Sequence, residues 1–257
     1  MIRTFFTELL YRPLFNALAW LYENVAFEDL GIAIILLTII VRIFLFPLFH
    51  QTVRHQRITQ NLQPEIKRIQ KDHKEDKETQ MQKIVELYDQ HKVNPMVPLL
   101  ALVVQIPIIF VLYRIFSHGF SGDSLNLLYP FITLPESPNQ SFLGLIDLTK
   151  SNLWVVAFAA VAQYIQGKLS LRKKNKAKGD DLSKAEKVGE SLTTFMPILT
   201  VVILFNLPAA IGLYWGATTV FSIFQQLIVN HSLNKEEGKK LSLGSHGESQ
   251  GENKGNI

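Results

Sequence analysis

The 257-residue chain contains no cysteine. This absence excludes disulfides, thiolate metal sites and a lipoprotein signal, which needs a cysteine to lipidate. A G-x-x-x-x-G-K-[ST] phosphate-binding loop is also absent. Charge is scarce: charged residues make up 19% of the chain and hydrophobic residues 47%. Because the charges are confined to a few blocks between apolar runs, the composition is typical of a membrane protein.

Apolar runs predict five helices that cross a membrane, because a helix needs about 20 apolar residues to span the hydrocarbon. The last apolar region, 192–230, is too long for one crossing. Pro208 cannot continue the helix that it follows, so this region divides at Asn206-Leu207-Pro208. The expected spans are 30–49, 96–117, 153–167, 192–206 and 209–230.

The connecting segments differ strongly in basic residues. Segments 50–95, 168–191 and 231–257 together hold 21 Lys and Arg, whereas 1–29 and 118–151 hold three. The positive-inside rule therefore places the N-terminus outside and the C-terminus in the cytoplasm. This asymmetry also accounts for the pI near 9.1 without a nucleic-acid partner. The chain is therefore expected in a membrane.

Two of the cytoplasmic segments are not expected to form a packed domain. The basic loop 168–191 contains LRKKNKAKG, whose simplest role is to anchor the topology; contact with anionic lipid or ribosomal RNA is the alternative. Segment 231–257 is rich in Gly, Ser, Lys and Glu, and this composition predicts a disordered cytoplasmic tail.

Segment 50–95 is predicted to form a cytoplasmic helical hairpin. Apolar residues recur at helical spacing in two thin stripes, and DHKED at 72–76 has no apolar residue and supplies the turn. The stripes are Ile58, Leu62, Ile66 and Ile69, then Met81, Ile84, Val85 and Tyr88. A solvated helical spacer and a mobile lid or docking arm both fit this pattern.

Segment 1–29 is predicted to be an interfacial helix on the outer face, with Ile2, Phe5, Phe6, Leu9 and Leu10 on one side. A cleavable signal peptide is the alternative, because Ala17-Leu18-Ala19 mimics a cleavage site. Glu8 and Arg12 interrupt the apolar core that such a signal needs. Segment 118–151 is predicted to be an outer loop, since several Gly and Pro break regular structure there.

Arg42 lies inside the apolar run from Leu30 to Phe49, where a charge costs roughly 2.5–3.5 kcal/mol on the insertion scale. It lies about 10 Å from the Phe49 end, so a snorkelling side chain is one explanation. No Asp or Glu occurs in any of the five spans, although ion-coupled carriers and pumps usually place a carboxylate there. The partner of Arg42 is therefore water, neutral dipoles or an acidic group that arrives from elsewhere.

Neutral polar residues in the other spans extend this candidate site. In the last span they recur at three- and four-residue steps, which places them on one face of the helix. Any one of them is best explained by hydrogen bonds between helices, but together with an unpaired arginine they favour a hydrated groove. This groove is expected to open toward the cytoplasm and to contain Arg42, Gln105, Gln163, Gln166, Trp215, Thr218, Thr219, Ser222 and Gln225, with Gln226 beside it.

Several motifs resemble the YidC/Oxa/Alb membrane insertases when they are taken in order along the chain. LLTIIVRIFLFPL is similar to the first conserved span of that family, and NPMVPLLALVVQIPIIFVLYRIF to the next. FLGLIDLTKSNLW is similar to the outer loop, and NLPAAIGLYWGATTVFSIFQQ to the last span. QPEIKRIQ and LYDQHKVNP match the cytoplasmic hairpin. The resemblance covers roughly residues 10–231.

The resemblance implies an all-α membrane protein in which five spans enclose an inward-open hydrophilic groove. It implies that Arg42 is the groove arginine, and that the protein inserts nascent membrane proteins without nucleotide hydrolysis, alone or with the Sec translocon. The ribosome and anionic lipids are further expected partners. No enzyme activity, cofactor, metal or sequence-specific nucleic acid is expected. Without a counterpart of the large periplasmic domain or of a lipidated cysteine, the resemblance is to a compact bacterial form.

Two other classes of function remain open on the residues alone. A small polar-solute channel or carrier would also need a wet path through the membrane. An assembly chaperone would hold the spans of other proteins without inserting them. The first of these is weakened by the absence of an apparent internal repeat.

Overall fold

The computed structural model describes residues 6–94, 96–118, 122–135, 138–170 and 184–251. The described chain is helical, as the sequence predicts, apart from one two-stranded hairpin. Its elements are η1 (Thr7–Tyr11), α2 (Arg12–Asn24), α3 (Leu30–Phe44), α4 (Phe46–Asn61), α5 (Gln63–Asp72), α6 (Lys77–Gln90), α7 (Val97–His118), η2 (Gly122–Leu127), β1 (Ser141–Phe142), β2 (Ile146–Asp147), α8 (Leu153–Ser170), α9 (Lys184–Phe205) and α10 (Ala209–Gly251).

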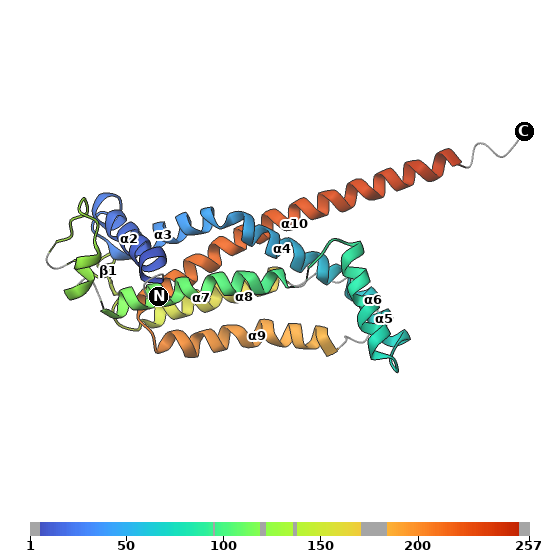
Figure 1. The fold of residues 1–257 in the computed structure, drawn as a ribbon, viewed down its shortest axis with the longest axis horizontal. Coiled ribbons are helices and arrows are strands. Elements are labelled where there is room, and N and C mark those ends of the chain that lie inside the picture. Colours follow the sequence, from blue (N-terminus) through green and yellow to red (C-terminus); the bar gives the residue numbers. More distant parts are fainter. Residues whose placement is uncertain (1–5, 95, 119–121, 136–137, 171–183, 252–257) are drawn as a thin grey trace, which may run out of the picture.

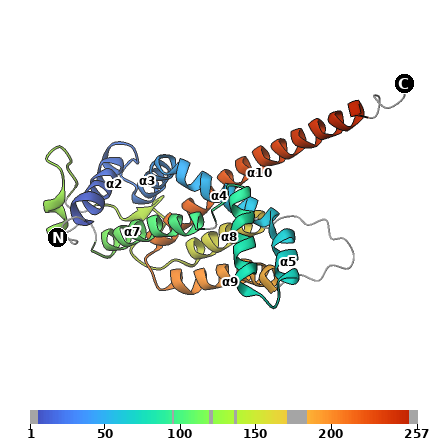
Figure 2. The same cartoon turned by 45° about the vertical axis from the view of Figure 1, so that its right-hand side comes forward.

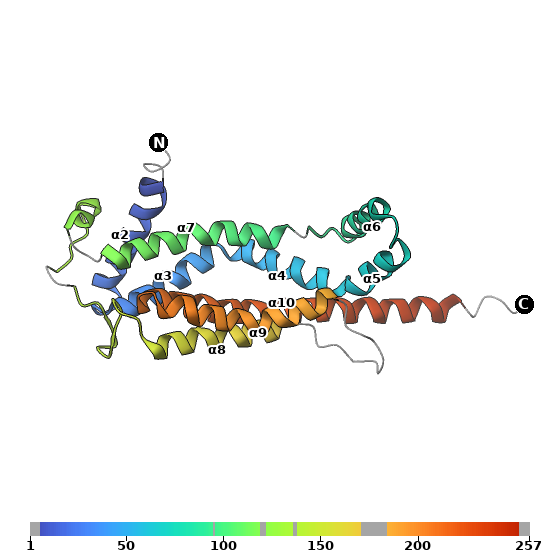
Figure 3. The ribbon, with the colours of Figure 1, turned by 90° about the horizontal axis from the view of Figure 1, so that it is seen from below.

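The long helices α7, α8, α9 and α10 run side by side along the long axis of the molecule, together with the α3–α4 pair (Figure 1). Helix α2 lies across this bundle at one end, near the β1–β2 hairpin (Figure 3). Helices α5 and α6 lie beside each other at the opposite end (Figure 2). The two non-bundle parts are therefore at opposite ends of the long helices.

A bilayer demands both length and apolar composition from a helix that crosses it. In the parts of the chain that the structure describes, no one helix is both long and apolar enough to cross a membrane by itself. Helices α3 and α4 meet these criteria only when taken as a pair, and that pair is bent by 70°. Shorter apolar stretches lie at Val103–Ser117 and Phe195–Phe205.

The bend divides the span that was expected to run from 30 to 49. Helix α3 ends at Phe44, Leu45 has φ −88° and ψ 5°, and α4 starts at Phe46 with Pro47 in its first turn. Proline has no N–H to donate to the preceding turn, and its ring clashes with the carbonyl four residues earlier, here that of Ile43. The break therefore follows from Pro47. Helix α4 continues to Asn61, well into the segment expected to be cytoplasmic.

Two glycines let α10 pack closely on α8. A Cβ at Gly212 would lie 2.9 Å from Val155 Cγ1, and one at Gly216 would lie 2.5 Å from Phe158 Cε1. Because the two glycines are four residues apart, they occupy one stripe of α10, the arrangement that lets the backbones of membrane helices approach. This contact fixes α8 against the helix that carries most of the candidate groove residues.

The end of the bundle that carries α2 and the β1–β2 hairpin is held by two buried polar residues. Asn16 of α2 donates to Leu127 O at 2.9 Å and accepts from the backbone N–H of Tyr129 at 2.6 Å. Asp29 accepts from the N–H of Ile32, which caps α3, and from the N–H of Leu143 in the β1–β2 turn. Both residues satisfy backbone groups that would otherwise lack partners.

Helix α2 is more deeply packed than an interfacial helix was expected to be. Its residues Phe15, Leu18, Ala19 and Tyr22 are buried in the main core. On the segment before it, Phe6 packs edge-on against Phe110, with ring centroids 5.7 Å apart. Leu9 is 57% exposed, and Ile2 and Phe5 lie outside the described residues. The apolar face of α2 is thus turned largely into the protein.

The α5–α6 hairpin has a small core of its own. Leu62, Ile66 and Leu87 are buried, and around them pack Ile58, Ile69, Ile84 and Tyr88. Met81 and Val85 of the expected stripe are exposed instead. Asp76 caps α6: hydrogen bonds from the Thr79 side chain and backbone lower the pKa of Asp76 below its ordinary value. The turn between α5 and α6 lies within DHKED at 72–76, as the sequence predicts.

Three further differences concern the expected boundaries and charges. Helix α9 begins at Lys184, inside the expected basic loop, and α10 continues through the segment expected to be disordered, to Gly251. Extending a formed helix needs no new nucleation, which favours this continuation. The sequence analysis overlooked a second cation within the expected spans, Arg114. Its guanidinium carbon lies 4.8 Å from the ring centroid of Tyr11. The break between α9 and α10 lies at Asn206–Pro208.

Candidate functional site

Arg42 projects from the last turn of α3 into the interior of the bundle. Only 6% of the residue is exposed, and its guanidinium carbon lies 4.1 Å from the ring centroid of Phe49, which stands on α4 beyond the bend. Its Nη1 is buried and has no hydrogen-bond partner among the described residues. The Tyr214 side chain of α10 lies close enough to Arg42 to interact with its charge. The result is a buried cation with an aromatic cover and unsatisfied hydrogen-bonding capacity.

Arg42 is more enclosed, within the described part of the chain, than an arginine in an open groove was expected to be. The sequence indicated a charge without a fixed counter-ion, but no pattern in it pointed to a ring lying on that charge. The bend at Leu45 brings Phe49, seven residues after Arg42, back onto the guanidinium. A cation on an aromatic face gains about 0.5–2 kcal/mol, which offsets part of the desolvation cost.

The polar residues of α10 lie on two sides of the helix: Gln225 contacts α4, whereas Trp215 and Gln226 contact α8. Thr218, Thr219 and Gln225 are buried, whereas Trp215 and Ser222 are half-buried. The hydroxyls of Thr219 and Ser222 donate to carbonyls of their own helix, four residues earlier, at 2.8 and 3.0 Å. Gln225 Nε2 donates to Phe46 O at 3.1 Å and so ties α10 to the start of α4. Gln226 is buried and accepts from Ser170 Oγ of α8 at 3.4 Å.

Gln163 joins three helices. Its Oε1 accepts from Thr200 Oγ1 of α9 at 2.6 Å and from Trp215 Nε1 of α10 at 3.1 Å. Gln166, one turn later on α8, is half-buried and makes no side-chain hydrogen bond to a described residue. Gln105 of α7 donates to the hydroxyl of Tyr214. Gln163 and Gln105 therefore link helices, the structural role that was the favoured alternative for single polar residues.

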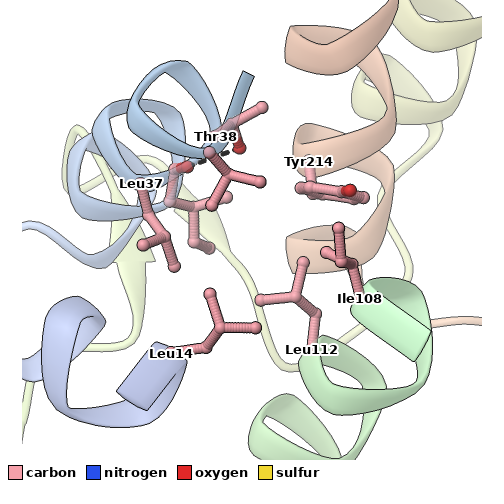
Figure 4. Close-up of a pocket in the computed structure, with 8 residues that line it drawn as sticks. Leu14, Leu37, Thr38, Ile108, Leu112 and Tyr214 are labelled. Carbon is pink, nitrogen blue, oxygen red and sulfur yellow. Dashed lines mark hydrogen bonds between the residues drawn. The ribbon is translucent and has the colours of Figure 1, made fainter. Parts of the chain in front are cut away.

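A small apolar pocket lies one turn before Arg42 along α3, toward α2. Figure 4 shows its lining, in which Tyr214 faces α3 and α7, and Thr38 donates to Ile34 O at 2.7 Å. The lining residues are Leu14, Ile34, Leu37, Thr38, Val41, Ile108, Leu112 and Tyr214. Apart from Thr38 and Tyr214 the lining is aliphatic, so this pocket suits no charged ligand. Apolar contacts therefore adjoin the Arg42 region on the side toward α2.

Most of the sequence, from residue 20 to residue 237, matches the family described as 60Kd inner membrane protein. The chain belongs to this family. The resemblance drawn from the ordered motifs is thereby confirmed, and the chain is a protein of the inner membrane, as members of the 60Kd inner membrane protein family are described.

Curated relatives of this 60Kd inner membrane protein family member carry the name membrane protein insertase YidC. The protein from Geobacter sulfurreducens is 28% identical over 233 residues, which are 90% of this chain and 39% of that protein. Those from Wolinella succinogenes and Rickettsia bellii are 29% and 26% identical, over 91% and 86% of this chain and 39% of each relative. The chain thus spans less than half the length of these relatives.

The structure brings together some of the predicted groove residues and adds others. Arg42, Thr218 and Gln225 lie around one buried region between α3, α4 and α10. Gln163 and Trp215 form a separate cluster with Thr200. The sequence reasoning missed Phe49, Tyr214 and Thr200. The sequence does show Tyr214 in a Leu-Tyr-Trp motif and Pro47 two residues before Phe49. Neither signal tells in which direction the Tyr214 or Phe49 side chain points.

The Gln163 cluster makes a direct prediction about stability. Gln163→Leu leaves the Thr200 hydroxyl and the Trp215 indole N–H without their acceptor, so the free energy of unfolding should fall by about 1–3 kcal/mol. Gln166→Leu, on the same helix, is the matched control and should change it by less than about 0.5 kcal/mol. Unfolding in mixed micelles, followed by tryptophan fluorescence, measures both. Equal effects of the two changes would contradict the role assigned to Gln163.

Proposed function

We propose that this protein inserts nascent membrane proteins into the bacterial inner membrane and helps them fold, without nucleotide hydrolysis. The observation that carries the proposal is Arg42: a buried guanidinium with an unsatisfied N–H and no acidic partner among the described residues. A charge held in this state binds a carboxylate strongly, because charge-assisted hydrogen bonds strengthen in a low dielectric. Family membership and the names of the relatives support this function.

The proposed membrane arrangement has five spans. They are the α3–α4 pair up to about its bend, then α7, α8, α9 and the first half of α10. The α5–α6 hairpin and the C-terminus are cytoplasmic, and α2 with the β1–β2 hairpin is outside. Rows of exposed apolar side chains support this arrangement, for example Phe195, Ile198, Val202 and Phe205 on α9 and Phe158, Val161 and Ile165 on α8. Side chains of this kind on the outside of a helix suit hydrocarbon.

In the proposed mechanism, insertion begins when an acidic or polar tail of the client protein enters the cytoplasmic half of the bundle. Arg42 binds the tail, and the hydroxyls and amides of Thr218, Ser222 and Gln225 replace part of its water. Arginine suits this step because its charge does not depend on physiological pH. Release follows when the apolar segment of the client moves into lipid, since burial of apolar area favours that direction. The exit lies beside α8 and α10.

The expected partners follow from this reaction. Nascent membrane proteins are the substrates, delivered by the ribosome, and the Sec translocon works with the protein on some of them. The α5–α6 hairpin recruits or gates, and anionic lipid contacts the basic loop. No catalytic residue, metal or cofactor takes part.

Insertion by purified protein tests the function. The protein is reconstituted in liposomes, a single-span client is synthesised in their presence, and protease protection of the client tail is measured with nucleotide removed after synthesis. Protection well above that of empty liposomes is expected. No gain over empty liposomes, together with selective flux of a polar solute, would establish the channel class instead. Client binding without protection of the tail would indicate a chaperone.

A further inference from the structure

An aromatic ring, that of Phe49, covers the charged end of Arg42. The ring of Phe49 lies over the guanidinium at 4.1 Å, a distance at which the ring face attracts the cation. The same face of the guanidinium is then closed to other groups, and the residue is only 6% exposed. Because the N–H groups of Arg42 are buried, a carboxylate can reach them only if a side chain that covers the guanidinium moves aside.

The helix is interrupted between Arg42 and Phe49. Arg42 and Phe49 stand on two helices that meet at Leu45 with a bend of 70°. The N–H of Leu45 still bonds to Val41 O, so the break is local. On the other side, Gln225 holds Phe46 O, which fixes the first turn of α4 to α10. Because this bond holds the start of α4, we expect the Phe49 ring to move by a change of its own rotamer.

We propose that Phe49 is an aromatic lid that an incoming carboxylate must displace to reach Arg42. The inference deepens the proposed function, on which its ligand class rests. In the absence of a client, the ring shields the guanidinium from lipid and water. An acidic tail exchanges a weak attraction to the ring for a stronger charge-assisted pair, whereas an uncharged tail gains too little to displace it. Phe49 thus makes Arg42 selective for acidic segments.

Arginine-specific labelling tests the lid without any insertion assay. The reconstituted protein is treated with phenylglyoxal, and modification of each arginine is followed by mass spectrometry, with exposed Arg54 as the reference. Arg42 should react slowly in the parent and about tenfold faster in Phe49→Ala, the change expected when a partly desolvated cation–π contact is lost. Phe49→Leu should lie between them. Phe44→Ala is the matched control, because Phe44 is 82% exposed, and it should react like the parent.

A peptide with an Asp-rich tail and an apolar segment tests the competition. It should protect Arg42 from phenylglyoxal more strongly in Phe49→Ala than in the parent, and its Asn-tailed counterpart should protect in neither. Equal labelling of Arg42 in the parent and Phe49→Ala, or equal protection in both, would overturn the lid. If labelling and protection follow the expectation but the reconstituted protein inserts no client above empty liposomes, the lid stands and the proposed function fails; insertion that is independent of Arg42 would instead remove only the role of Arg42 in it.

Discussion

Arg42→Ala is expected to lower the insertion of a client with an acidic tail by about tenfold or more, because hydrogen bonds to charged groups contribute about 1.5–3 kcal/mol. In the structure the guanidinium is buried, lacks an acidic partner in the described chain and has a free Nη1. The carboxylate of a client is the group that would complete this site. Initial rates of tail translocation in proteoliposomes measure the effect.

Two comparisons isolate the charge of Arg42. Arg42→Lys keeps the charge and should behave nearly like the parent if charge alone matters, whereas a loss close to that of Arg42→Ala would mean that the planar fork is required. Arg54→Ala removes an exposed arginine from α4 and should leave insertion unchanged. Replacing Asp by Asn in the client tail should reduce insertion by the parent but have little further effect on Arg42→Ala. A full additional loss there would contradict direct pairing.

Gly31→Ala is expected to be the most destabilising small substitution at the contact between α3 and the β1–β2 hairpin. A Cβ at Gly31 would overlap the Phe142 side chain and lie 2.5 Å from its Cβ, an atom that cannot move without the β1 backbone. The hairpin must therefore shift from α3 and strain the bond between Asp29 and Leu143. Overpacking of this kind costs about 1–3 kcal/mol, and proteolysis of the hairpin together with unfolding in mixed micelles measures it.

A second substitution distinguishes the clash from a general loss of hairpin order. Phe142→Gly removes the opposing Cβ, so the pair Gly31→Ala with Phe142→Gly should be more stable than the sum of the two single effects predicts. Gly144 has φ +67°, and a Cβ added there would meet no atom within 4 Å. Gly144→Ala should therefore cost only about 1 kcal/mol, from backbone strain. Strict additivity of the pair would contradict the close approach.

Much of the helical framework could be predicted because its signals are local. Asn206-Leu207-Pro208 marks the break between α9 and α10, and the apolar stripes of the hairpin include most of its core residues. Each of these features depends on a few neighbouring residues, whose conformational preferences do not need the rest of the fold.

The features that the sequence did not predict depend on distant contacts. Pro47 could have indicated the break at Leu45, but a proline in the first turn of a new helix and one inside a long span look alike in sequence. The Phe49 ring on Arg42 requires that break and its angle. Gln163 was grouped with the groove, although its partners Thr200 and Trp215 come from helices that approach it only in the fold. The deep burial of α2 likewise depends on contacts with residues that are distant in the sequence.

A disulfide trap most directly tests whether the tail of an acidic client meets the charge of Arg42 inside the bundle. Because the chain has no cysteine, Thr218→Cys places a single thiol in the buried region beside Tyr214. A ribosome-held client with one cysteine in an Asp-rich tail should form a disulfide with this thiol. The yield should fall sharply when Asn replaces Asp or when Arg42→Ala is added. Equal yields for acidic and neutral tails, unaffected by Arg42→Ala, would contradict the account.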